Sequence, residues 1–216
     1  MAERYEKFRQ CTEAEVITVL EGVLQSLSQA ANGKVRILYV PGNGEILPGD
    51  FSVNDISIEQ ALPPEERFYQ KIAREGFFGH FGIEYIPYAY NLDGIALLST
   101  NLLDLGLKEA INILEKCKIP TGTELRAVVV HYPPAISPIG RTFSFWNPNK
   151  VDVLRIDALS KILKELRLQR TTIFFGHIHL DPDDPRMASY PPIMGFKINE
   201  GNAFWVKPGE LTEIGL

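Results

Sequence analysis

Two histidines one residue apart, His177 and His179, follow a short apolar run, Ile173 to Phe175, and a glycine. The chain has only four histidines, so half of them lie in this segment. Alternate residues of an extended segment share one face, so both imidazoles could face one ion. Neutral imidazole suits a borderline divalent metal such as Zn, Mn or Fe. The pattern indicates a metal site, although a His-x-His pair by itself is equally compatible with two ordinary polar residues.

Two other strand-like runs end on residues with related chemistry. Residues 35–40 lead into Asn43, and residues 125–130 lead into His131. Ligands of open α/β sheets gather beyond the carboxyl ends of the strands, so such a sheet would bring these residues to His177. Taken singly, a histidine at a strand end is usually an ordinary polar residue, and Gly-Asn is a common turn. The three strand ends together predict the metal site.

The helices and strands that must position these residues can be predicted from the periodicity of apolar residues and from the residues that typically end such elements. Apolar residues recur every three or four positions over residues 13–31, which predicts a helix, and Asn32-Gly33 is a typical helix end. Alternating helices and strands predict an α/β fold in a single domain over residues 1–216. Further helices are expected around 64–75, at 107–117 and at 151–167, and strands at 35–40, 95–99, 125–131, 171–175 and, as a closing pair, within 192–207.

The composition excludes several classes of protein. Hydrophobic residues make up 45% of the 216 residues and charged residues 23%, as in ordinary globular proteins. A net charge of −5 without a basic patch argues against nucleic acid as a partner. Two cysteines without motif spacing are typical of a reducing compartment. With no signal-peptide core and no apolar run long enough to span a bilayer, the sequence predicts a soluble cytoplasmic protein without membrane contacts.

Three motifs, in this order along the chain, resemble those of calcineurin-like metallophosphoesterases. They are Pro41-Gly42-Asn43, then VVVHYPP at residues 128–134, then Gly-His-Ile-His at residues 176–179. The family carries GNH[DE], a histidine after a buried strand, often as H-x-P-P, and GHxH. Residues 85–101 and the Lys-Pro-Gly turn at 207–209 resemble further family segments. The resemblance covers about residues 15–210.

The resemblance implies two packed β-sheets flanked by helices, a four-layer sandwich, with two metal ions at the carboxyl ends of the strands. In such enzymes a metal-bridging hydroxide attacks a phosphate ester in line. By carry-over, Asn43, His131 and His177 would bind one ion and His179 the other. The substrate would be a small-molecule phosphate ester or a phosphoprotein.

Two departures from the family pattern concern the active site itself. The family's N-terminal D-x-H and GDxxD motifs are absent from this chain, and Gly44 stands where the GNH histidine belongs. Without the bridging aspartate, Asn43, His131 and His177 would form a weak one-ion site. Loss of a general-acid histidine typically lowers the rate by ~10²–10⁴-fold.

Two hypotheses follow from these departures, and a third is that the strand-end histidines are coincidental. The chain is either a phosphoesterase-type hydrolase whose first strands are missing, or a degenerate relative that serves as a binding or regulatory module. Gly44 favours the second hypothesis, and the retained histidines favour the first. Missing strands would leave an apolar sheet edge, which would favour pairing into a homo-oligomer.

Overall fold

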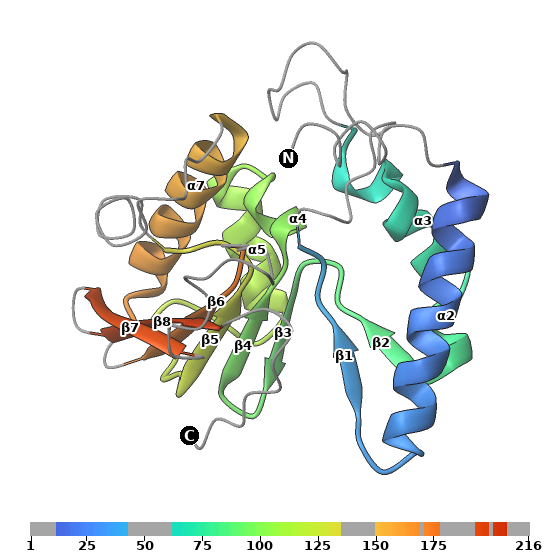
Figure 1. The fold of residues 1–216 in the computed structure, drawn as a ribbon. Coiled ribbons are helices and arrows are strands. Elements are labelled where there is room, and N and C mark those ends of the chain that lie inside the picture. The colour runs from blue at the N-terminus through green and yellow to red at the C-terminus, as the bar shows by residue number, and fades with distance from the viewer. Residues whose placement is uncertain are drawn as a thin grey trace, which may run out of the picture. The chain divides into compact units, whose positions relative to one another are not determined.

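The computed structural model describes residues 12–42, 62–134, 150–168, 171–177, 193–198 and 201–206. These residues form an α/β fold with two β-sheets flanked by helices (Figure 1). The chain divides into two compact units, one of residues 1–40 and 44–86, the other of residues 41–43 and 87–216. Such units occur within single domains as well as between domains, so one domain over residues 1–216 stays a prediction.

The first unit begins with helix α2 (Glu13–Ala31), and local signals fix both of its ends. The Thr12 hydroxyl accepts a hydrogen bond from the Glu15 backbone N–H at 3.3 Å, and the Glu15 carboxylate accepts one from the Thr12 N–H at 2.7 Å. This reciprocal capping box satisfies two N–H groups that the helix leaves unpaired. The helix ends at Asn32, which adopts the left-handed conformation with φ 46°. The helix predicted for residues 13–31 is therefore confirmed.

The sheet of the first unit pairs β1 (Ile37–Tyr39) in parallel with β2 (Ile83–Tyr85). The helix expected around 64–75 is a 3-10 turn, η3 (Pro64–Glu66), followed by α3 (Phe68–Arg74), and a second turn, η4 (Gly79–Phe81), follows. Apolar side chains from these elements and α2 form one core. Its buried members are Leu20, Leu24, Phe68, Ile72, Phe78 and Ile83.

The second unit is built on a sheet that has six strands in the described part of the chain, in the order β3-β4-β5-β6-β8-β7. Strands β4, β5, β6 and β8 are parallel, and the edge strands β3 and β7 are antiparallel to their neighbours. The strands predicted near 95–99, 125–131 and 171–175 and the closing pair within 192–207 are confirmed. The bounds are β3 (Ala89–Leu92), β4 (Ile95–Leu98), β5 (Ala127–Val130), β6 (Thr172–Phe175), β7 (Ile193–Ile198) and β8 (Gly201–Val206).

Helices α4 (Thr100–Leu103), α5 (Leu107–Lys116) and α7 (Lys150–Leu166) pack on one face of this sheet. Side chains of one strand face are two residues apart, and such alternate residues of the central strands join the helices in one core. The strand members are Ala96, Leu98, Val128, Val130, Ile173 and Phe175. The two longer helices confirm the predictions for residues 107–117 and 151–167.

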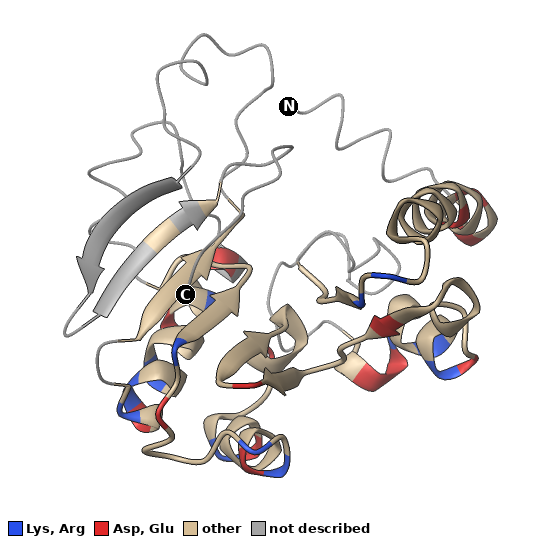
Figure 2. Cartoon of the chain, turned by 90° about the horizontal axis from the view of Figure 1, so that it is seen from below, with Lys and Arg blue, Asp and Glu red and all other residues tan. Residues whose placement is uncertain are grey.

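Strands β3 to β6 carry no Lys, Arg, Asp or Glu residue (Figure 2). This distribution follows from burial, because a charge within the sheet would have to leave water without a partner. Among the helices in the described part of the chain, none combines the length and the apolar character that a membrane span requires.

Candidate metal centre

The two histidines that follow β5 and β6 lie side by side. These strands are adjacent and parallel, with Val130 opposite Phe175, so their carboxyl ends lie at the same edge of the sheet. His131 follows β5 directly, and the Gly176 N–H donates to its carbonyl at 3.1 Å, which extends the pairing by one residue. The chain therefore delivers His131 and His177 to one place, as expected from the strand ends.

The nitrogen atoms of the two imidazoles face each other. His131 Nε2 lies 3.0 Å from His177 Nδ1, and the ring planes are inclined by 76°. This spacing fits a hydrogen bond in which one ring donates and the other accepts. It equally fits two ligands of one ion, because nitrogens bound at ~2.1 Å and at right angles lie about 3.0 Å apart. The pair thus has the spacing of neighbouring ligands in an octahedral or similar site.

The segment after β1 also reaches this edge of the sheet of the second unit. The Thr100 N–H donates to the Pro41 carbonyl at 3.0 Å. The next residue, Gly42, lies so close to His131 that an added Cβ would be 2.8 Å from Nδ1 and 2.9 Å from Cε1. Only glycine fits here unless the His131 ring moves. The predicted ligand Asn43 directly follows Gly42 but lies outside the described residues, as does His179.

Asp152 on α7 contacts the other side of His177 and was not predicted from the sequence. Its Oδ2 lies 3.5 Å from His177 Nε2, and its Oδ1 accepts a hydrogen bond from the Tyr132 hydroxyl at 3.0 Å. The Tyr132 ring lies against the His177 ring, with centroids 4.3 Å apart. The signal for Asp152 was present, since it occupies the helical stripe of the buried Ile156 and Leu159. An acidic residue at a buried position requires a polar partner.

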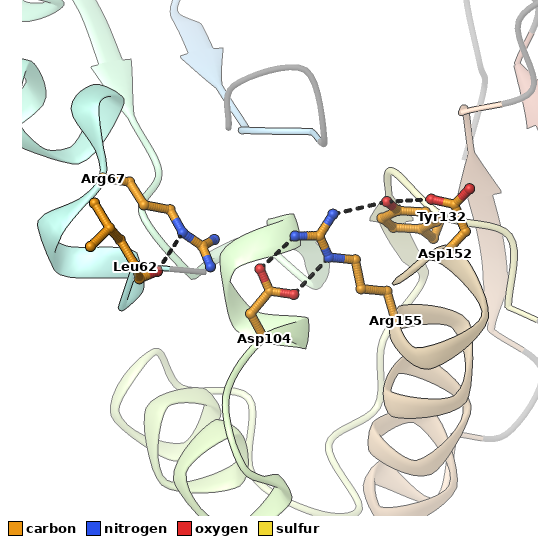
Figure 3. A network of polar contacts seen from close by, with 6 residues as sticks. All are labelled: Leu62, Arg67, Asp104, Tyr132, Asp152 and Arg155. Atoms are coloured by element: carbon orange, nitrogen blue, oxygen red, sulfur yellow. Dashed lines mark hydrogen bonds and ion pairs between the residues drawn. The ribbon is translucent and has the colours of Figure 1, made fainter. Parts of the chain in front are cut away.

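Tyr132 also contacts a buried ion pair between Arg155 and Asp104 (Figure 3). Arg155 binds Asp104 through two hydrogen bonds, both 2.6 Å long, and donates a third to the Tyr132 hydroxyl at 3.1 Å. The side chains of Arg155 and Asp104 are 3% and 1% exposed. Figure 3 also draws a separate contact of the first unit, in which Arg67 Nε donates to the Leu62 carbonyl at 3.0 Å. The guanidinium of Arg155 thus fixes the position of the Tyr132 hydroxyl.

Protonation states within the network follow from burial and pairing. Burial lowers the pKa of the Arg155 guanidinium, but the hydrogen bonds and charge of Asp104 outweigh it, so the pKa is raised above its ordinary value. Burial also raises the pKa of the Tyr132 hydroxyl, because a phenolate would be poorly solvated there. Arginine therefore stays charged, and the tyrosine stays a donor to Asp152.

The metal site predicted from the sequence is not complete among the described residues. They contain no group of three or more His, Cys, Asp and Glu side chains arranged to hold an ion. For an ion to bind at the two facing nitrogens of His131 and His177, Asn43, backbone groups or water would have to complete the ligand set. The remaining histidine, His80, is exposed in the turn η4.

Comparison of the chain with protein-family models, with curated proteins and with solved structures gave no match. A functional assignment must therefore rest on the motifs of the sequence and on the geometry of the second unit.

Proposed function

We propose that this chain is a metallophosphoesterase-like protein that binds a divalent ion through His131 and His177 and hydrolyses phosphate esters. The observation that carries the proposal is the 3.0 Å approach of the two imidazole nitrogens at the carboxyl ends of two parallel strands. The close packing of Gly42 against His131 supports it, since all three motifs of the resemblance then contribute a residue to one place. Three coincidental turns would not be expected to meet in this way.

The proposal includes the ligands that lie outside the described residues. Asn43 follows Gly42 and would add an amide oxygen to the ion bound by His131 and His177, while His179 would bind a second ion. Manganese, iron and zinc all accept imidazole and oxygen ligands. When bound, such an ion lowers the pKa of a coordinated water and so supplies the attacking hydroxide. The substrate is a small-molecule phosphate ester or a phosphoprotein, and the overall fold is the four-layer sandwich of that family.

A second candidate is a non-catalytic binding or regulatory module on the same scaffold. Gly44 favours it, because the family has at this position a histidine that assists the reaction, and glycine can neither donate nor accept a proton there. Such a module would retain the ion at His131 and His177 but would not hydrolyse the ester. The two candidates therefore agree on metal binding and differ in hydrolysis.

One experiment tests the proposal and separates the candidates. Metal content and Mn²⁺-dependent hydrolysis of a generic phosphodiester are measured for the parent, for His177→Ala and for His80→Ala, a matched control in the exposed turn η4. The parent and His80→Ala are expected to bind metal and to hydrolyse the ester, and His177→Ala is expected to lose the ion beside His131 and the hydrolysis. Bound metal without hydrolysis in the parent would favour the module. Equal metal content and equal activity in the parent and His177→Ala would refute the metal centre.

A further inference from the structure

We propose that Asp152 is a positioning residue, which holds the His177 ring so that Nδ1 faces the ion beside His131 Nε2. The inference rests on the proposed function. It adds a residue that belongs to none of the three motifs and that helix α7, rather than a strand end, brings to the site.

The geometry places Asp152 and His131 on opposite nitrogens of the same ring. Asp152 Oδ2 lies 3.5 Å from His177 Nε2, whereas His131 Nε2 lies 3.0 Å from His177 Nδ1. A neutral imidazole carries one proton, and a carboxylate beside Nε2 favours the proton on that atom. Nδ1 then keeps its lone pair, which is the form a metal ligand needs. Metal-bound histidines commonly donate their other ring N–H to a carboxylate, and the 3.5 Å contact places the Asp152 carboxylate on that side of the His177 ring.

The Asp152 carboxylate is oriented by a chain of hydrogen bonds that runs through Tyr132 and Arg155 to Asp104. Its Oδ1 accepts from the Tyr132 hydroxyl at 3.0 Å, and that hydroxyl accepts from Arg155 at 3.1 Å. Arg155 is fixed by its two hydrogen bonds to Asp104. In Figure 3 these side chains form one connected line from Asp104 to Asp152. Rotation of the Asp152 carboxylate away from His177 would break its hydrogen bond with the Tyr132 hydroxyl, so this bond favours the orientation toward His177.

Burial distinguishes Asp152 from an ordinary helix carboxylate. The Asp152 side chain is 9% exposed and that of His177 is 7% exposed, so water screens their interaction little. Asp157, on the same helix, is 57% exposed and pairs with Lys161. It offers a control in which the same substitution removes a carboxylate remote from the histidines.

Two measurements on the full chain separate a positioning role from a merely structural one. Co²⁺ binding is followed by visible absorption for the parent, Asp152→Asn and Asp157→Asn. The tautomer of His177 in metal-free protein is read from imidazole ¹⁵N shifts in mildly alkaline buffer, where imidazole is ordinarily neutral. Asp152→Asn is expected to bind Co²⁺ about 10- to 100-fold more weakly and to populate the Nδ1–H tautomer. The parent and Asp157→Asn are expected to bind equally and to show the Nε2–H tautomer.

The outcomes keep this inference apart from the proposed function. Equal Co²⁺ affinity and the same tautomer in the parent and Asp152→Asn would overturn the positioning role and leave the metal centre intact. Failure of the parent itself to bind Co²⁺ would overturn both. If Asp152→Asn does not fold, Tyr132→Phe decides, because it keeps the carboxylate and removes one hydrogen bond that orients it. An affinity about 2- to 10-fold below the parent supports the inference, and an unchanged affinity overturns it.

Discussion

Replacement of Gly42 by alanine is expected to displace the His131 ring and weaken metal binding. The added Cβ would lie 2.8 Å from His131 Nδ1, whereas ordinary van der Waals contact begins at 3.4 Å. The difference, 3.4 − 2.8 = 0.6 Å, is the least distance that must open between the two groups. The backbone of Gly42 is not in the left-handed region, so the substitution acts through this contact rather than through backbone strain.

The displacement is large compared with the tolerance of a metal site. Ligand distances in such sites vary by about 0.2 Å, so a ring moved by 0.6 Å can no longer share an ion with His177 in the same geometry. Overpacking of this kind costs about 1–3 kcal/mol. If the metal-bound state alone bears this free energy, Co²⁺ binds roughly 5- to 150-fold more weakly.

The assay is a Co²⁺ titration of Gly42→Ala beside the parent and Gly22→Ala. Gly22 lies within α2 with no atom within 4 Å of its added Cβ, so the control introduces the same methyl group without a clash. Gly22→Ala should leave Co²⁺ binding unchanged and raise the free energy of unfolding by about 0.5–1 kcal/mol, because glycine is unfavourable within a helix. Parental Co²⁺ affinity in Gly42→Ala would show that the position of His131 does not matter for the ion, and the reasoning would fail.

Two further predictions concern the buried network. Arg155→Met removes both hydrogen bonds that Asp104 accepts from the guanidinium and should lower the free energy of unfolding in urea by about 3–5 kcal/mol. Lys161→Met, which breaks the exposed pair with Asp157, should change it by less than about 1 kcal/mol, and equal losses would contradict the argument. Burial raises the pKa of Tyr132, so above about pH 10 the unfolded chain loses a proton that the folded chain keeps, and stability should fall as pH rises. Urea titrations at increasing pH should show a smaller fall for Tyr132→Phe, and parallel curves would refute the buried hydroxyl as its source.

Elements with local signals could be predicted from the sequence. Helix α2 agrees with its predicted range because an apolar stripe, a capping box and Asn32 all lie within the helix or beside it. Helices α5 and α7 agree with their predicted ranges to within one residue because each carries an apolar stripe. The central strands β5 and β6 were recognisable because each is a short apolar run that ends at a polar residue.

Short elements that depend on distant partners were not predicted. Strand β2 has three residues and forms by pairing with β1, with Ile37 opposite Ile83. Strand β3 and helix α4 have four residues each, too few for a periodicity to show. Their conformation is determined by tertiary contacts, which overrule weak local preferences.

Within the candidate site, too, some contacts could be predicted from the sequence and others could not. The strand ends predicted that His131 and His177 would approach each other, because parallel neighbours carry adjacent residues to one edge. The contact of Asp152 with His177 depends on how α7 lies over the sheet, which no spacing in the sequence encodes. The need for glycine at position 42 depends on the orientation of the His131 ring. Sequence reasoning therefore reached the proximity of the two histidines and not the groups that fix its geometry.

The backbone of His177 adopts a conformation that is unfavourable for a residue with a side chain. Its φ of 69° lies in the left-handed region, which costs a residue with a Cβ roughly 1–2 kcal/mol. Judged by conformation alone, glycine would suit this position better than histidine. Such strain persists where the surroundings determine the conformation, and here the His131 ring, the Tyr132 ring and the Asp152 carboxylate all contact the His177 side chain. Lys118 and Arg167 also adopt positive φ, so this conformation alone assigns no function, and the proposed role of the imidazole rests on the contacts of its ring.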